Sequence, residues 1–168
     1  MIDLKRVLVA TDFGDAAGVA LLYGRELARA FNADLHVLHV VEDVASRALV
    51  MSAGTPEEIV LAQAGIVDDA RRRLNELLAD AGRAPLHATA VVETSGTPAA
   101  AIVNYARRVD AGLVVIGTHG RGPVTHLLLG NVAERVVRTA PCPVLTIRHP
   151  EHEFVVPDPS EDRGEERA

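Results

Sequence analysis

Short apolar runs alternate along this chain with longer segments in which apolar residues recur every three or four positions. The runs are rich in Val, Ile and Leu, and they have the length and composition of buried β-strands. Glycine, proline and polar residues separate them from the segments that follow. The pattern predicts five strands, over residues 6–10, 35–41, 86–92, 112–117 and 144–148.

Helical spacing marks the segments between these runs. Apolar residues at intervals of three and four predict helices over 15–31, 56–81, 98–109 and 130–140. Thr97 is expected at an N-cap with Pro98 in the first helical position, and Gly82 is a typical helix stop. The stretch 42–56 shows neither period and is expected to be irregular, ending in the helix-start signal Gly54-Thr55-Pro56.

This alternation of strands and helices predicts an α/β fold. Strands joined through helices form right-handed crossovers, which give a parallel sheet with helices on both faces. Strands that are apolar along their whole length are typical of such doubly covered sheets. Open sheets of this kind bind ligands outside the carboxyl ends of their strands, where the winding direction reverses. The loops directly after the strands are therefore the first place to search for function.

The first of these loops is Thr11-Asp12-Phe13-Gly14. The Asp12 carboxylate could accept hydrogen bonds from amino or hydroxyl groups of a ligand. Aspartate is also common in turns and at helix N-caps, and from the residues alone this structural explanation has the larger share.

A glycine-rich loop follows the fourth predicted strand, and five of the 13 glycines lie between Gly112 and Gly130. Glycines let backbone N–H groups turn toward an anion, and the helix that starts near Gly130-Asn131 adds its partial positive charge. Asn131 could cap that helix or reach a phosphate oxygen. Within the loop Arg121 is a candidate phosphate partner; His119 is either a second one or a simple loop histidine. A surface loop without a ligand remains the alternative.

Composition and charge exclude several classes of protein. The 168 residues suffice for one domain, and the single Cys142 excludes a disulfide scaffold and fits a reducing compartment. Residues 149–168 carry five of the six net negative charges and are expected to form an acidic disordered tail after a domain at 1–148. The nearly neutral domain has no basic surface for nucleic acid. With no apolar run of membrane length and no signal peptide, a cytoplasmic location is expected.

The common catalytic and nucleotide motifs are missing. The sequence contains no G-x-x-x-x-G-K-[ST], no G-x-G-x-x-G after the first strand and no G-x-S-x-G. His36 and His39 differ by three positions along a strand, so they should point to opposite faces and cannot form a metal pair. The run Arg71-Arg72-Arg73 is expected to be a solvated helix face. An enzyme on this topology is therefore disfavoured.

Three segments of the chain resemble the universal stress protein family, over about 5–148. They are RVLVATD at 6–12, LHVLHVVE at 35–42 and DAGLVVIGTHGRGPVTHLLLGNVAERVVRTAPCPVLTIR at 110–148. The last is similar to the nucleotide motif of the ATP-binding subgroup, G-x2-G-x9-G-[ST], with Gly117, Gly120 and Gly130 in the glycine positions. The departure is Asn131 where the family has Ser or Thr, which loses a compact hydroxyl.

The resemblance implies a five-stranded parallel sheet in the order 3-2-1-4-5 and a site for ATP or another adenine nucleotide such as AMP or ADP. Mg²⁺ would enter through the phosphates. The implied site lies around Thr11, with Asp12 at the adenosine, the backbone near Val40 and Val41 at the adenine edge, and Ile116 and Gly117 at the ribose. N–H groups of Gly120, Gly130, Asn131 and Val132 would hold the phosphates.

The resemblance also implies a homodimer that pairs its last strands, formed by Val144, Leu145, Thr146, Ile147 and Arg148. An uncovered apolar edge strand is a pairing hazard, which agrees with that expectation. The hypothesis is a nucleotide-binding stress-response protein with at most slow hydrolysis. The alternatives are a dimer that regulates a protein partner without nucleotide and, with less support, a nucleotide hydrolase.

Overall fold

The computed structural model describes residues 3–51, 54–79, 87–118 and 130–148, apart from the side chains of residues 49–51. The strands and helices in these ranges follow one another as predicted, with one additional helix. They are β1 (Arg6–Ala10), α1 (Asp15–Phe31), β2 (Asp34–Val41), α2 (Val44–Met51), α3 (Pro56–Ala79), β3 (Ala88–Thr94), α4 (Pro98–Arg108), β4 (Leu113–Gly117), α5 (Asn131–Thr139) and β5 (Val144–Ile147).

The described strands form one parallel sheet in the order β3-β2-β1-β4-β5. This order and the α/β fold class are as predicted. The chain winds outward from β1 to β2 and β3, and then returns to the other side of β1 as β4. The winding direction therefore reverses between β1 and β4, and the crevice expected of such a sheet lies at the carboxyl ends of these two strands.

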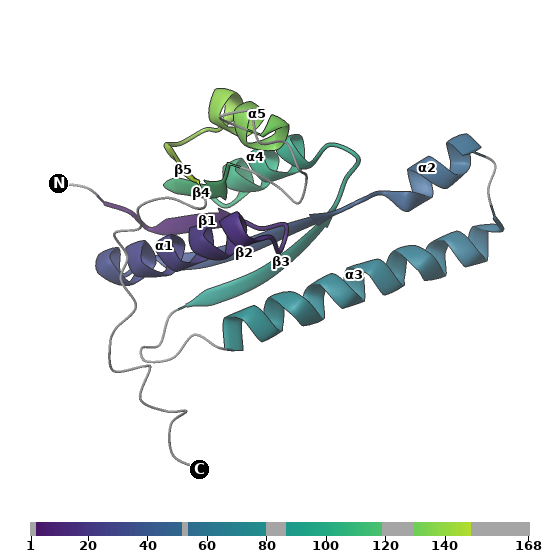
Figure 1. Cartoon of the computed structure of the whole chain (residues 1–168), viewed down its shortest axis with the longest axis horizontal. Helices are drawn as coiled ribbons and strands as arrows, with labels where there is room; N and C mark the ends of the chain where they lie inside the picture. The colour runs from purple at the N-terminus through teal and green to yellow at the C-terminus, as the bar shows by residue number, and fades with distance from the viewer. Residues whose placement is uncertain (1–2, 52–53, 80–86, 119–129, 149–168) are drawn as a thin grey trace, which may run out of the picture.

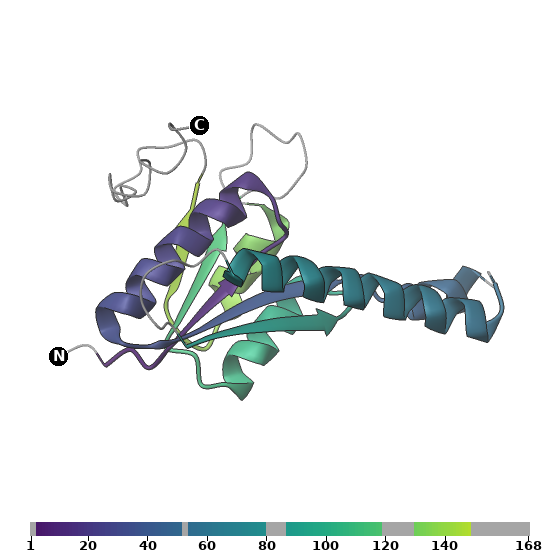
Figure 2. The same cartoon turned by 90° about the horizontal axis from the view of Figure 1, so that it is seen from below.

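Helices cover both faces of the sheet (Figures 1 and 2). Because successive side chains of a strand point to opposite faces, β1 contributes to two cores. Val7 and Val9 pack in the core beneath α1 and α3, whereas Leu8 packs in the core beneath α4 and α5. All three side chains are fully buried. The apolar run of β1 thus reflects a strand that is covered twice.

The expectation of an irregular stretch at 42–56 is wrong for Val44–Met51, which forms helix α2. The Asp43 carboxylate caps this helix, because its oxygens accept hydrogen bonds from the Ser46 N–H at 3.0 Å and the Ser46 hydroxyl at 2.6 Å. In Figure 2, α2 and the first part of α3 project beyond the sheet. An element with little contact to the core shows little apolar period, which is why the sequence pattern missed it.

The helix starts agree with the sequence in position. Thr55 and Glu58 form a reciprocal cap before α3, in which the Thr55 N–H donates to the Glu58 carboxylate at 2.8 Å. Thr97 occupies the N-cap of α4 with Pro98 next to it, but the Thr97 hydroxyl makes no capping hydrogen bond. β3 begins and ends two residues later than predicted, and it pairs with β2 along its whole length. The predicted stop at Gly82 lies outside the described residues.

Candidate functional site

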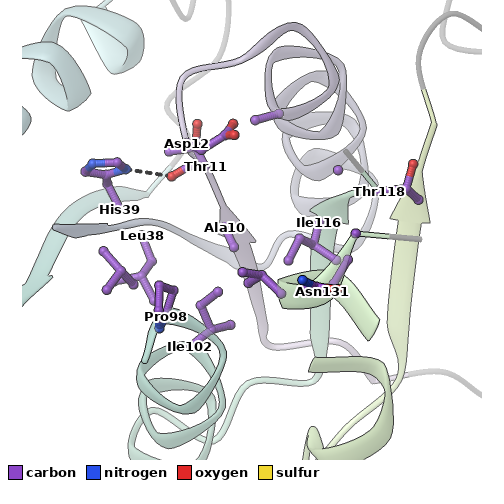
Figure 3. Close-up of a pocket in the computed structure, with 16 residues that line it drawn as sticks. Ala10, Thr11, Asp12, Leu38, His39, Pro98, Ile102, Ile116, Thr118 and Asn131 are labelled. Atoms are coloured by element: carbon purple, nitrogen blue, oxygen red, sulfur yellow. Dashed lines mark hydrogen bonds between the residues drawn. The ribbon is translucent and has the colours of Figure 1, made fainter. Parts of the chain in front are cut away.

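A cavity of about 280 Å³ opens at the carboxyl ends of β1 and β4, where the winding of the sheet reverses (Figure 3). Its volume is near the lower end of the range of small-molecule sites, about 300 Å³ and above. Its inner wall is apolar and buried, and is formed by Ala10, Leu38, Ile102 and Ile116. Polar groups come from the loop after β1 and from the start of α5.

The cavity exists because β1 and β2 diverge at their carboxyl ends. Their pairing ends at Ala10 and Leu38, and one further hydrogen bond runs from the Thr11 N–H to the Leu38 carbonyl at 2.9 Å. Beyond this point β1 turns away into α1, while β2 continues to Val41 beside β3. The two residues that follow Leu38 therefore have no strand beside them on the β1 side, and with Leu38 they border the cavity.

The turn after β1 is built by its own side chains. The Asp12 Oδ1 accepts the Gly14 N–H at 2.9 Å, and the Thr11 hydroxyl accepts the Phe13 N–H at 3.0 Å. Asp12 also lines the cavity. The two explanations that the sequence left open are therefore compatible, since one carboxylate oxygen holds the turn while the residue borders the ligand space.

Val40 and Val41 differ in what they present to the cavity. Peptide groups of alternate residues in a strand point the same way, so those of Val40 share the direction of the Leu38 carbonyl, toward β1. Val40 lines the cavity. Val41 does not: its side chain borders a second cavity on the α3 side, and its carbonyl accepts the Ser95 N–H at 3.0 Å. Of the two residues that the sequence prediction grouped, Val40 borders the cavity and Val41 does not.

Gly117 ends β4 at a point of close approach between the sheet and α1. A β-carbon added there would lie 2.9 Å from the Ala16 carbonyl carbon, which is closer than real contacts allow. Gly117 and Ile116 both line the cavity. Glycine is thus required here for packing against the first turn of α1, whatever the ligand.

The start of α5 supplies backbone donors. Its first intrahelical bond runs from the Glu134 N–H to the Gly130 carbonyl at 2.9 Å, so the N–H groups of residues 131 to 133 precede the helical ladder. Gly130 is the N-cap, which places Asn131 in the first helical position with its side chain at the cavity. Asn131 therefore does not cap the helix. The positive end of the helix faces the cavity at Asn131 and Val132.

One detail of the implied phosphate site needs correction. The Gly130 N–H donates to the Thr118 carbonyl at 2.6 Å, and the Thr118 N–H donates to the Ile147 carbonyl at 2.7 Å. These bonds tie the start of α5 to the ends of β4 and β5. Gly130 lines the cavity, but its N–H is already engaged within the chain.

His119, Gly120 and Arg121 lie outside the described residues, and so does the rest of the glycine-rich loop up to Leu129. Of the predicted site residues that are described, all except Val41 line the cavity: Thr11, Asp12, Val40, Ile116, Gly117, Gly130, Asn131 and Val132.

Several cavity residues were not predicted, among them His39, Pro98 and Thr118. His39 sits at the end of β2, and its Nδ1 lies 2.7 Å from the Thr11 carbonyl (Figure 3). The position of these residues at strand ends or helix starts was available in the sequence. Each lies close to the carboxyl end of a strand, where ligands bind in sheets of this kind, and this is the sequence signal that points to them.

The other strand histidine, His36, lies on the opposite face of the sheet from His39, as predicted. Its Nδ1 lies 2.7 Å from the Tyr105 hydroxyl, on the α4 side of the sheet. Burial lowers the pKa of the His36 imidazole, and it raises the pKa of the Tyr105 hydroxyl. Within the ranges that the structure describes, no three His, Cys, Asp or Glu side chains are placed to share a metal ion.

The basic run on α3 is mostly paired with acidic neighbours. Arg71 lies 3.4 Å from the Asp68 carboxylate, and Arg72 pairs with Asp69 and Glu76. Both arginines are largely exposed, as expected of a solvated face. Arg73 differs, because its guanidinium carbon lies 4.0 Å from the centre of the Phe13 ring.

These features define a class: an open parallel α/β protein with a ligand-sized cavity at the reversal of strand order, bounded by a helix N-terminus. The chain matches the model of the universal stress protein family over residues 3–148, and it belongs to that family. The match confirms the resemblance found in the sequence, and it supports the expectation of a stress-response protein that is not an enzyme.

Individual relatives extend over nearly the same length. The universal stress protein MJ0531 of Methanocaldococcus jannaschii is 32% identical over 151 residues, which cover 89% of this chain and 85% of the relative. The solved structure of UspA from Lactobacillus plantarum is 27% identical and aligns with a TM-score of 0.66, covering 88% of this chain and 100% of UspA.

A third relative was solved with a ligand. The universal stress protein of Archaeoglobus fulgidus in complex with dAMP aligns at 24% identity with a TM-score of 0.53, over 88% of this chain and 99% of that protein. Identity at this level shows a shared fold.

In the described part of this chain, no helix is long and apolar enough to cross a membrane.

Proposed function

We propose that this protein binds an adenine nucleotide in the cavity at the carboxyl ends of β1 and β4, and acts as a binding and regulatory module with at most slow hydrolysis. The observation that carries the proposal is the shape of the site. A buried apolar wall runs between the Val40 backbone and the N-terminus of α5. A purine base packs against apolar side chains, whereas a charged phosphate needs N–H donors and the positive end of a helix. The cavity offers both surroundings.

The base would lie at the β2 end of the cavity. There Leu38 and Ile102 provide apolar contact, and the peptide of Val40 can exchange hydrogen bonds with the edge of a purine. Asp12 lies above this end, where a carboxylate oxygen can accept from an amino or hydroxyl group of the nucleoside. Figure 3 shows His39 and Asn131 on opposite sides of the cavity.

The phosphates would lie at the start of α5. The N–H groups of Asn131 and Val132 belong to the first turn, where donors have no helical acceptor and the helix dipole favours negative charge. A relative of the same fold was solved in complex with dAMP, which supports the proposal of an adenine-nucleotide site without locating the phosphate. A resident cation would be Mg²⁺ bound through the phosphates themselves.

The proposal includes a cytoplasmic homodimer formed through β5. The Ile147 carbonyl accepts from the Thr118 N–H, and the Pro143 carbonyl accepts from the Val114 N–H. The peptide groups of the odd-numbered residues of this segment therefore face β4. Val144 and Thr146 have the other parity, and their peptide groups point to the outer side of the sheet. A second copy related by two-fold symmetry can pair with this edge. Residues 1–148 would form the stress-protein domain, with 149–168 as an appended acidic tail.

The test is calorimetric titration with ATP, ADP and AMP in the presence of Mg²⁺. Val40→Trp fills the base end of the cavity and is expected to abolish binding. Val60→Trp is the matched control, because Val60 is 67% exposed on α3. The wild-type chain contains no Trp, so each variant also reports its own environment by fluorescence. Absence of heat with wild-type protein, or equal binding by Val40→Trp, would refute the proposal.

One observation favours the alternative of a partner-regulating dimer without nucleotide. Asn131 replaces the hydroxyl residue of the family motif, and the Gly130 N–H is already engaged by Thr118. The phosphate end therefore offers fewer donors than the family motif implies. Mass spectrometry of small molecules released from freshly purified protein decides between the two, since the alternative expects none. A turnover well above the uncatalysed rate would instead support a hydrolase.

A further inference from the structure

Phe13 is held in a backbone conformation that its side chain alone does not favour. Its φ angle is +63°, in the left-handed region where glycine and asparagine are usual. Such a residue persists when its surroundings over-determine it. Phe13 follows Asp12 directly, so whatever holds Phe13 also orients the carboxylate at the rim of the cavity.

Two side chains from distant parts of the chain hold the Phe13 ring. The Arg73 guanidinium of α3 lies over one side, with its carbon 4.0 Å from the ring centre. The His39 imidazole of β2 packs against the ring with centroids 4.4 Å apart and a tilt of 45°. A cation over an aromatic ring and a tilted aromatic pair are both favourable contacts.

His39 also acts on the backbone of the same loop. Its Nδ1 lies 2.7 Å from the Thr11 carbonyl, and since a carbonyl can only accept, Nδ1 carries the hydrogen. In a trans peptide the C=O and the following N–H point in opposite directions. The bond therefore sets the plane of the Thr11–Asp12 peptide and directs the Asp12 N–H away from the imidazole.

The contact with Arg73 lies at the point where α3 begins to pack against the sheet. Of the described side chains of this long helix, Ala70 and Leu74 are the buried ones. A cavity of about 420 Å³, bordered by Phe13, His39 and Arg73, separates the preceding turns of α3 from the sheet. Arg73 thus lies in the anchoring turn of α3, at its junction with the loop that carries Asp12.

We infer that Arg73 and His39 are positioning residues for the nucleotide site, acting through the Phe13 ring and the Thr11 carbonyl to fix the loop that presents Asp12. Neither needs to touch the phosphates. The inference rests on the proposed function for its consequence in binding, and on geometry for its consequence in the loop. Binding of the adenosine end is thereby linked to the docking of α3.

The first experiment compares Arg73→Gln with Arg73→Lys and with the control Arg71→Gln. Arg71 is on the same helix and pairs with Asp68 away from Phe13. Loss of the cation at residue 73 is expected to weaken AMP binding by about two- to fivefold, the usual worth of such a contact. Arg73→Lys keeps a cation and should restore most of the affinity. Arg71→Gln should bind as wild type does.

Titration calorimetry separates positioning from general damage. A partly unfolded variant binds with a lower stoichiometry, whereas a displaced loop raises the dissociation constant at unchanged stoichiometry. Because the effect acts on the adenosine end, AMP and ATP should lose affinity by the same factor. An unchanged dissociation constant in Arg73→Gln, or an equal loss in Arg71→Gln, overturns the inference while leaving the proposed function intact.

A second readout needs no ligand. The amide NMR signals of Asp12 and Gly14 should shift in Arg73→Gln and stay in place in Arg71→Gln. His39→Ala should shift them further, and His39→Asn should bring them part of the way back, because an Asn side chain can still donate to the Thr11 carbonyl. If the wild type binds no nucleotide, the proposed function fails and these signals alone decide the inference, with unmoved signals overturning it.

Discussion

Replacing Asn131 by Asp changes the charge at the start of α5 while barely changing the shape of the side chain. Asn131 is the first residue of the helix, it is exposed, and it borders the cavity. A carboxylate there faces two partners of opposite sign. The positive end of the helix attracts it, whereas a bound phosphate repels it.

The two interactions have magnitudes that can be set side by side. A negative side chain in the first turn stabilises an exposed helix by about 0.3–1 kcal/mol. A carboxylate about 5 Å from a phosphate charge costs roughly 1–3 kcal/mol at an effective dielectric between that of water and that of a protein surface. Asn131→Asp is therefore expected to stabilise the free protein slightly and to weaken ATP binding by about 5- to 150-fold.

Urea unfolding of the free protein and calorimetric titration with ATP and adenosine measure both effects. Adenosine should lose little affinity, because it carries no phosphate. Asn131→Ser, which restores the hydroxyl of the family motif without adding charge, is the matched control and should bind ATP at least as well as wild type. If Asn131→Asp weakens adenosine and ATP equally, or leaves ATP binding unchanged, the phosphates do not lie at this helix end.

Three further predictions concern the fold and the assembly. Gly24→Ala should destabilise the protein by about 1–3 kcal/mol in urea unfolding, because the added β-carbon would lie 2.2 Å from the Val9 Cγ2. Burial keeps the pKa of His36 below its ordinary value, so its folded form resists protonation and stability should fall as pH drops below about 6.5. His36→Gln should remove part of this loss between about pH 7.5 and about pH 5. Thr146→Pro removes an outward N–H of β5 and should shift the proposed dimer to monomer in light scattering, with Thr146→Val as control; a variant that keeps a dimer mass would place the interface elsewhere.

The fold was predictable because the central strands of the sheet, β1 and β4, are buried on both faces. In β1, the four residues after Arg6 are all apolar, and the helices between the strands carry a clear inner face. The pattern did not predict α2, because the described part of this helix is not packed against the sheet and so has no buried apolar face to reveal it. It projects with the first part of α3 away from the sheet, and a capping contact from Asp43 rather than an apolar stripe marks its start.

The site was predictable in its location and less so in its atoms. Strand alternation alone could have separated Val40 from Val41, because their peptide and side-chain directions are opposite. The engagement of the Gly130 N–H by Thr118 could not have been seen, since it depends on how the ends of β4 and α5 meet. The contact between Phe13 and Arg73 joins residues that no local pattern relates, and it appears only when α3 is placed on the sheet.

The departure at Asn131 changes a side chain of the family motif and leaves the backbone donors of the motif in place. The donors at the start of α5 are main-chain N–H groups, and a change from Ser or Thr to Asn leaves them in place. What changes is the third partner of a phosphate oxygen, from a short hydroxyl to a longer amide that can donate but occupies more of the cavity. Because a monophosphate has fewer oxygens to satisfy than a triphosphate, this substitution should narrow the preference for ATP over AMP, and Asn131→Ser should widen it.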